Sequence, residues 1–165
     1  YEAEDFLKVP EPLIQKEFSR IMSLKDGSKK MSKSELSDLS RINLTDDKDQ
    51  IINKIKKAKT DPLPMPGDIN DLDTRLEAKN LLGIYASLDN SSLKNSVENF
   101  SGKNFSEFKD KLSEKLIDKI VPISNEIKKL LRDQSYLDKI LLDGVEKANL
   151  IASKKIERIK EIVGF

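Results

Sequence analysis

The sequence has 165 residues, of which 37% are hydrophobic and 36% charged, and this apolar fraction is too high for a disordered chain. It contains no Cys and no His, which excludes disulfides, thiolate nucleophiles and imidazole as a general base or metal ligand. The formal net charge of +1 gives no global attraction to nucleic acid, so any basic surface has to come from local clusters of Lys and Arg.

Two features of the chain bear on its location. No apolar run approaches the roughly 20 residues that a membrane-spanning helix needs, and no signal peptide opens the chain. We therefore expect a cytoplasmic protein without membrane contact. The first residue is Tyr1 rather than Met, and we interpret the chain as a fragment or a processed product.

The first third of the sequence predicts little regular structure. Residues 1–18 contain two prolines and are expected to form an extended connector. Residues 19–24 alternate imperfectly between polar and apolar side chains and predict a short strand. Residues 25–34 are rich in Lys and Ser and contain the turn signal Asp26-Gly27, so they predict a loop with too few apolar side chains to pack.

The next two segments have opposite properties. Apolar residues recur at helical spacing over residues 49–59, with Asp46 and Asp47 placed to favour the positive end of the helix dipole. Residues 60–67 contain three prolines and predict a rigid loop.

From residue 76 onward, the apolar spacing and the capping signals predict four more helices. The first lies around Leu76–Leu88, and the second runs from Ser91 to Phe100 and is ended by Gly102. The third is opened by Asn104 with Glu107 and is kinked at Pro122. The last is opened by Ser135 with Asp138 and is ended by Gly164. We therefore predict a mainly α fold, with a helical bundle over residues 46–165.

One motif carries recognisable chemistry. Residues 30–34 read Lys-Met-Ser-Lys-Ser, the KMSKS signature of class I aminoacyl-tRNA synthetases. The segment before it, Arg20-Ile-Met-Ser-Leu, and later strings such as Asn80-Leu-Leu-Gly-Ile-Tyr-Ala extend the similarity. Over essentially its whole length the chain resembles the C-terminal half of bacterial tryptophanyl-tRNA synthetases. It departs from many members at Glu35-Leu36, where they have Asp-Pro.

The resemblance implies an ATP-binding loop. Pyrophosphate leaves when an aminoacyl adenylate forms, and cations and donors held in place stabilise the charge on it. Lys30 and Lys33 would supply the charge, while Ser32 and Ser34 would donate hydrogen bonds. Gly27 would let the loop move. The family implies further that the backbone of Ile21 and the residue Met31 flank the adenine, and that Mg²⁺ accompanies ATP; we expect no metal site in the protein itself.

The resemblance also implies a division of the chain. Residues 1–45 would be the edge of a class I catalytic domain, and residues 46–165 an α-helical tRNA-binding domain. The family's histidine-containing HIGH motif and tryptophan pocket are absent here, so we expect this chain alone to be inactive. The implied partners of the full-length enzyme are tRNA(Trp), tryptophan and a second identical subunit. The alternative is a non-catalytic helical RNA-binding or interaction module derived from a synthetase.

Two clusters of basic residues are candidates for contact with the tRNA backbone. One is the string Lys54-Ile-Lys-Lys-Ala-Lys, and the other lies on the last helix (Lys147, Lys154, Lys155, Arg158 and Lys160). Acidic residues are interspersed along both, and an ordinary solvated surface explains them equally well.

Overall fold

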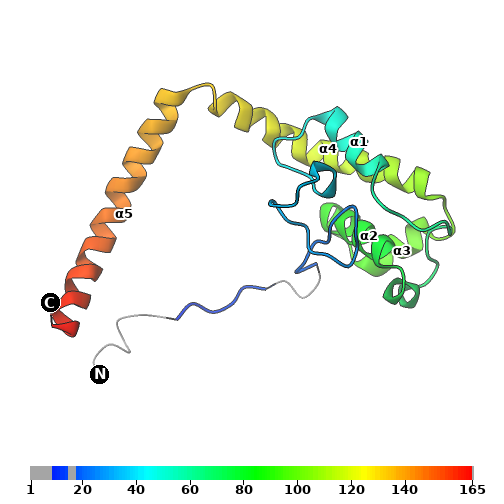
Figure 1. The fold of residues 1–165 in the computed structure, drawn as a ribbon, viewed down its shortest axis with the longest axis horizontal. Helices are drawn as coiled ribbons and strands as arrows, with labels where there is room; N and C mark the ends of the chain where they lie inside the picture. The colour runs from blue at the N-terminus through cyan, green and yellow to red at the C-terminus, as the bar shows by residue number, and fades with distance from the viewer. Residues whose placement is uncertain (1–8, 15–17, 165) are drawn as a thin grey trace. The chain divides into compact units, whose positions relative to one another are not determined.

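A computed structural model of the chain describes residues 9–14 and 18–164. In this part of the chain the elements are η1 (Asp38–Ser40), α1 (Lys48–Lys56), η2 (Ile69–Asp73), α2 (Leu76–Asp89), α3 (Leu93–Phe100), α4 (Phe105–Leu130) and α5 (Gln134–Val163), drawn in Figure 1. The predicted mainly α fold is confirmed. The strand predicted over residues 19–24 is wrong, because the only β-bridge of these described residues is the isolated one between Met22 and Lys30.

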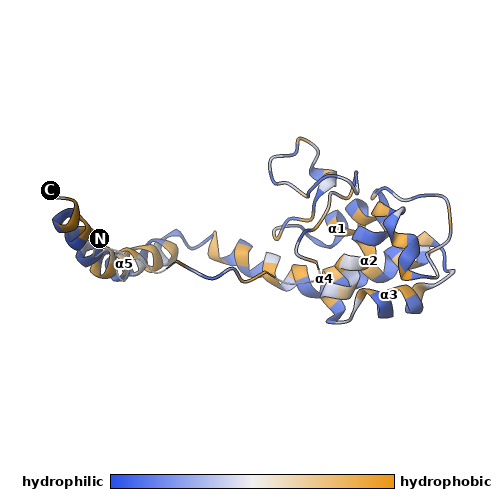
Figure 2. Cartoon of the chain, turned by 90° about the horizontal axis from the view of Figure 1, so that it is seen from below, coloured by the Kyte–Doolittle hydropathy of each residue, from blue (hydrophilic) through white to orange (hydrophobic). Residues whose placement is uncertain are grey.

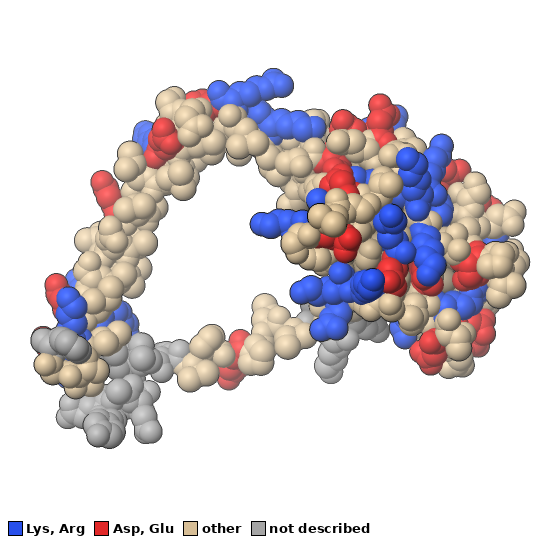
Figure 3. All heavy atoms as spheres, viewed as in Figure 1, with Lys and Arg blue, Asp and Glu red and all other residues tan. Residues whose placement is uncertain are grey.

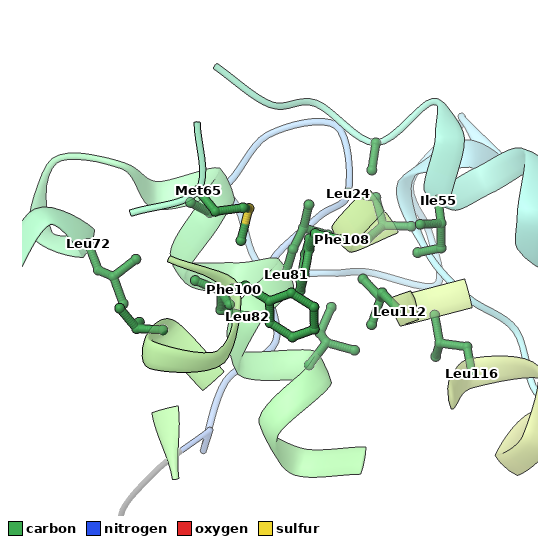
Figure 4. Packing of buried hydrophobic residues seen from close by; sticks show 14 of the residues in the cluster. Leu24, Ile55, Met65, Leu72, Leu81, Leu82, Phe100, Phe108, Leu112 and Leu116 are labelled. Atoms are coloured by element: carbon green, nitrogen blue, oxygen red, sulfur yellow. The ribbon is translucent and has the colours of Figure 1, made fainter. Parts of the chain in front are cut away.

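The chain divides into two compact units. Residues Gln15–Ile127 make one unit, while Tyr1–Ile14 with Lys128–Phe165 make the other. The first unit contains α1 to α3 and most of α4, and it holds the hydrophobic core shown in Figure 4. Its buried members include Ile51 and Ile55 of α1, Leu81 and Leu82 of α2, and Phe108, Leu112 and Leu116 of α4.

An aromatic cluster joins three helices within this core. The ring of Phe100 lies 4.9 Å from that of Tyr85 and 4.8 Å from that of Phe108, and both pairs meet edge to face. Edge-to-face contact brings the positive ring edge to the negative ring face, and each such pair adds about 0.5–1.5 kcal/mol beyond burial. Helices α2, α3 and α4 are therefore fixed to one another at this point.

Helix α1 begins with a capping box. The carboxylate of Asp47 accepts the N–H of Gln50, and the amide oxygen of Gln50 accepts the N–H of Asp47, both at 2.9 Å. Asp46 has a different role from the one we predicted. It is buried and binds Lys54 at 2.6 Å, so it serves an ion pair rather than the helix dipole.

Lys54 is the buried centre of a charge network. Its side chain is 3% exposed, and its ammonium group lies 2.6 Å from Asp46 and 2.7 Å from Asp38. The side-chain amide of Asn43 donates to both carboxylates, at 2.9 Å and 3.2 Å. The hydrogen bond from Lys54 holds the pKa of Asp38 below its usual value. This network attaches the irregular segment 38–46 to α1.

Two of the predicted helix starts are displaced. Helix α3 begins at Leu93, where Ser92 rather than Ser91 accepts the N–H of Asn95 at 3.2 Å. Helix α5 begins two residues earlier than expected, because Asp133 accepts the N–H of Tyr136 at 3.0 Å and replaces the predicted cap at Ser135. In each case several short polar residues compete for one cap, and the sequence pattern does not rank them.

The proline-rich loop 60–67 is fixed by one arginine. The guanidinium of Arg75 forms a two-pronged pair with Asp61, at 2.9 Å and 2.7 Å, and donates to the C=O of Pro64 at 2.7 Å. At the far end of the loop, Met65 is buried and its N–H donates to the C=O of Lys103 at 2.8 Å. The rigid loop that the prolines predict is thus also tied to its surroundings.

The two last helices differ in burial. Helix α4 continues through Pro122 as one element, and its stripe from Phe108 to Leu116 is buried. Helix α5 carries apolar residues along one side, as the hydropathy colouring in Figure 2 shows, but none of its residues is buried. Within the described residues, no helix is long and apolar enough to cross a membrane.

Replacement of Lys54 tests the charge network. Lys54→Ala leaves the Asp46 carboxylate buried without a cation, and we expect the free energy of unfolding to fall by about 3–5 kcal/mol. The exposed neighbour Lys57 provides the matched control, since Lys57→Ala is expected to change it by no more than about 0.5 kcal/mol. Urea unfolding followed by circular dichroism measures both. Equal effects of the two variants would contradict the assigned role of Lys54.

Candidate active site

The residues of the KMSKS motif extend one arm of a short hairpin, and we call residues 21–34 the KMSKS hairpin. The N–H of Met31 donates to the C=O of Ile21 at 3.0 Å, and the N–H of Ser23 donates to the C=O of Lys29 at 2.8 Å. Met22 and Lys30 face each other in the antiparallel bridge. The structure thus brings Ile21 and Met31, the two predicted adenine contacts, into direct backbone contact.

The turn of the hairpin follows the predicted Asp26-Gly27 signal. The carboxylate of Asp26 accepts the hydroxyl of Ser28 at 2.6 Å and the backbone N–H of Ser28 at 3.0 Å. These two hydrogen bonds, the hydroxyl first, hold the pKa of Asp26 below its usual value. An Asp that binds the backbone two residues later is a common way of closing a tight turn.

Gly27 is needed for a close approach to α2. A Cβ atom at this position would lie 2.8 Å from the backbone N of Glu77 and 2.8 Å from the carbonyl carbon of Leu76. Such distances are too short for any side chain, and the backbone atoms of a helix do not move aside easily. Loop mobility at Gly27 stays a prediction, while its close contact with α2 is a separate reason for glycine here.

The side chains of the motif differ in exposure. Met31 packs partly buried against the core, so the loop does contain an apolar anchor that our sequence analysis missed. Lys30, Lys33 and Ser34 are exposed, and the hydroxyls of Ser32 and Ser34 lie 3.0 Å apart. Neither lysine forms an ion pair with any described residue. Both ammonium groups are therefore accessible to an anion.

Contacts from outside the hairpin hold its first arm and the residue that follows its second arm. Leu24 donates its N–H to the C=O of Ser40 at 2.9 Å and accepts the N–H of Lys59 at 2.7 Å. After the motif, Arg41 donates from its guanidinium to the C=O of Glu35 at 2.9 Å. The hairpin is thus attached both before and after Lys30–Ser34.

A cavity of about 500 Å³ lies beside the hairpin, between residues 18–22 and helices α2 and α3. Ile21 and Met22 form part of its wall, whereas Lys30 to Ser34 do not line it. Its size is typical of a small-molecule site. The cavity is not, however, a place where the two lysines of the motif converge on a ligand.

The basic cluster predicted over residues 54–59 is partly wrong as a surface for tRNA. Lys54 is buried in its charge network, and Lys59 pairs with Glu77 at 2.7 Å. Only Lys56 and Lys57 are exposed without such a pair. The face of the molecule seen in Figure 3 also carries acidic side chains among the basic ones, as an ordinary solvated surface does. On α5, Arg158 pairs with Glu161 at 2.8 Å.

Sequence reasoning missed several residues that hold the hairpin. The side-chain amide of Asn80 in α2 binds both backbone groups of Met22. Lys54 and Arg41 fix the segment that follows the motif. A faint signal existed for two of them, because Asn80 and Lys54 are polar residues at buried positions of apolar helix stripes, where each requires a partner.

Comparison with known proteins identifies the family. Residues 1–121 match the family model described as tRNA synthetases class I (W and Y). The chain belongs to this family. It is 46% identical over 160 residues to a tryptophan–tRNA ligase of Mesorhizobium japonicum, which covers 97% of this chain and 45% of the relative. It is 49% identical over 162 residues to the corresponding ligase of Rickettsia felis, covering 98% of this chain and 48% of the relative.

A solved structure shares the fold. The crystal structure of a tryptophanyl-tRNA synthetase from Mycoplasma pneumoniae matches with a TM-score of 0.78 at 26% identity, covering 99% of this chain and 49% of that one. The resemblance to tryptophanyl-tRNA synthetases stated from the motifs is confirmed by these relatives. The chain spans about half the length of the curated relatives that it matches.

The pair between Glu77 and Lys59 makes stability depend on pH. The hydrogen bond from Lys59 lowers the pKa of Glu77 from its usual 4.5, and the same bond raises the pKa of Lys59 from 10.5. A lowered carboxylate pKa contributes stability that is present above pH 4.5 and is lost as the pH falls through the folded-state pKa. The raised ammonium pKa contributes stability below pH 10.5 that is lost at higher pH.

We therefore expect Glu77→Gln to be less stable than the native chain at neutral pH, with a difference that shrinks as the pH falls below 4.5. Urea unfolding at a series of pH values measures the difference. Glu114→Gln is the control, because Glu114 pairs with Lys111 at an exposed site where such a pair contributes little. A Glu77→Gln difference that stays constant from neutral to acidic pH would contradict this assignment.

Proposed function

We propose that this chain is the C-terminal part of a tryptophan–tRNA ligase, which activates tryptophan with ATP to Trp-AMP and transfers it to tRNA(Trp). Membership of the class I family and the names of the relatives support this activity. The chain spans about half of those relatives, and its own part in the reaction is the contact with ATP.

The observation that carries the proposal is the state of the two lysines of the motif. Lys30 and Lys33 are exposed and have no ion-pair partner among the described residues, while the backbone around them is held by hydrogen bonds. Cations on a prearranged backbone stabilise charge on departing phosphates without a cost of rearrangement. Lys30 and Lys33 thus serve the leaving pyrophosphate.

The neighbouring residues complete the ATP contact. Ser32 and Ser34 donate hydrogen bonds to phosphate oxygens, and their hydroxyls lie on the same side of the loop, 3.0 Å apart. The backbone of Ile21 and the residue Met31 flank the adenine. ATP is a substrate, and Mg²⁺ is expected with it by family resemblance. Among the described residues no group of three or more His, Cys, Asp or Glu side chains is arranged to hold a metal ion, so none is assigned to Mg²⁺.

The chain contributes to two domains of the enzyme. Residues 1–45 form the edge of the catalytic domain, and residues 46–165 form the tRNA-binding domain. Tryptophan binds outside this chain, and the complete enzyme is a homodimer that acts in the cytoplasm. For contact with tRNA, the exposed Lys56 and Lys57 are better placed than the buried Lys54.

Lys33→Ala tests the role of the motif in the complete enzyme. Loss of one cation that acts on the transition state is expected to slow adenylate formation by about 10²- to 10³-fold, with little change in the affinity for tryptophan. ATP–pyrophosphate exchange measures the rate. Lys29→Ala is the matched control, because Lys29 is an exposed lysine of the same hairpin outside the motif. A near-normal rate in Lys33→Ala would overturn the assignment.

A second experiment separates the ligase from a non-catalytic RNA-binding module. The 165-residue chain alone is expected to show no tryptophan-dependent exchange, since it has no histidine and the family resemblance implies that the tryptophan pocket lies outside this chain. The same chain within the complete protein is expected to be active. Turnover by the chain alone would mean that the active site is misplaced, and an inactive complete protein that still binds RNA would favour the module.

A further inference from the structure

The backbone of residues 21–24 directs its polar groups alternately to two sides, as a β-strand does. On one side, the C=O of Ile21 and the N–H of Ser23 pair with the other arm of the hairpin, at 3.0 Å and 2.8 Å. On the other side lie the groups of Met22 and Leu24. Leu24 pairs there with backbone groups, whereas none of the described residues forms a strand on this side of Met22.

The side chain of Asn80 takes the place of that missing strand. Its oxygen accepts the N–H of Met22 at 2.9 Å, and its nitrogen donates to the C=O of Met22 at 2.8 Å. A carboxamide carries the same donor and acceptor as a peptide group, so it can complete both bonds at once. Asn80 is 8% exposed and lies in α2, 58 positions along the chain from Met22.

Two glycine contacts show that the segment of residues 18–27 lies along one face of α2. Gly27 lies against the backbone of Leu76 and Glu77, and a Cβ at Gly83 would come within 3.1 Å of the Phe18 ring. Helix positions 76, 80 and 83 share one face, because a helix repeats every 3.6 residues. Asn80 is the middle of these three contacts and the one that forms hydrogen bonds.

The position of Met22 bears directly on the ATP contacts. Met22 follows Ile21 in the chain and faces Lys30 across the bridge. Displacement of Met22 therefore moves both the residue proposed to flank the adenine and the first lysine of the motif. Without Asn80, the two polar groups of Met22 would have to turn toward water, which pulls this part of the hairpin from α2.

We propose that Asn80 is a positioning residue for ATP. Its carboxamide fixes the position of the hairpin against α2, and thereby the positions of Ile21 and Lys30 relative to the nucleotide. Asn80 itself does not contact the substrate. The inference rests on the proposed function, because it assumes that this hairpin binds ATP.

The test compares Asn80→Ala and Asn80→Asp in the complete enzyme, by ATP–pyrophosphate exchange with ATP and tryptophan varied separately. The KM for ATP is expected to rise by on the order of tenfold in Asn80→Ala, as the loss of two hydrogen bonds implies, while the KM for tryptophan stays within about twofold. Asn80→Asp is expected to raise the KM for ATP at least as much, because its carboxylate places an acceptor oxygen against the C=O of Met22, to which it cannot donate.

A control and a second readout separate positioning from general stability. Val97→Ala shortens a buried side chain of α3 and leaves the hydrogen bonds between Asn80 and Met22 in place, and it is expected to lower stability without changing the ratio of the two KM values. Hydrogen exchange of the peptide covering residues 21–24 is expected to be faster in Asn80→Ala and native-like in Val97→Ala.

Three results would overturn the proposal. An unchanged KM for ATP in Asn80→Ala would show that the hydrogen bonds serve stability alone, and so would an equal rise of both KM values. Hydrogen exchange of residues 21–24 as slow as in the native protein would show that Met22 does not depend on Asn80. Absence of ATP–pyrophosphate exchange in the native enzyme would instead contradict the proposed function together with this inference, so the two failures are distinguishable.

Discussion

The backbone of Leu24 joins three distant parts of the chain. Its N–H binds the C=O of Ser40 at 2.9 Å, and its C=O binds the N–H of Lys59 at 2.7 Å, while its side chain is 2% exposed in the core. Either group would cost roughly 1–3 kcal/mol if it were left buried and unpaired. The hairpin, the segment around η1 and the end of α1 are therefore held in one arrangement, and the KMSKS motif begins six residues after this joint.

Ion pairs hold the segment that follows the motif, whereas backbone hydrogen bonds hold the segment that precedes it. Lys54 is buried and binds Asp46 and Asp38, so residues 38–46 cannot leave α1 without exposing an ion pair that is satisfied only in this arrangement. Arg41 continues the network to the C=O of Glu35, next to the last serine of the motif. The motif is thus supported on both sides by residues that do not belong to it.

Local signals in the sequence were sufficient for most of the fold. Apolar spacing predicted the helices, Asp26-Gly27 predicted the turn, and the prolines of residues 60–67 predicted a loop, because each property is decided within a few residues. The sequence did not reveal the partners of Asn80 or Lys54, which lie 58 and up to 16 positions away. Nor did it rank Ser92 over Ser91, or Asp133 over Ser135, as caps, since these choices depend on where the whole helix packs.

The lysines of the chain show why their number predicts so little about anion binding. Lys54 is paired with the buried Asp46 and with Asp38, and Lys109 donates to the C=O groups of Lys56 and Ala58. Burial lowers the pKa of Lys109. Such groups stabilise the fold and cannot at the same time meet a ligand. Lys30 and Lys33 have no partner among the described residues, and their backbone is fixed from both sides. A lysine without an ion-pair partner on a fixed backbone binds an anion with little loss of conformational entropy. The surrounding network, rather than the composition of the loop, therefore makes these two lysines suitable for binding phosphate.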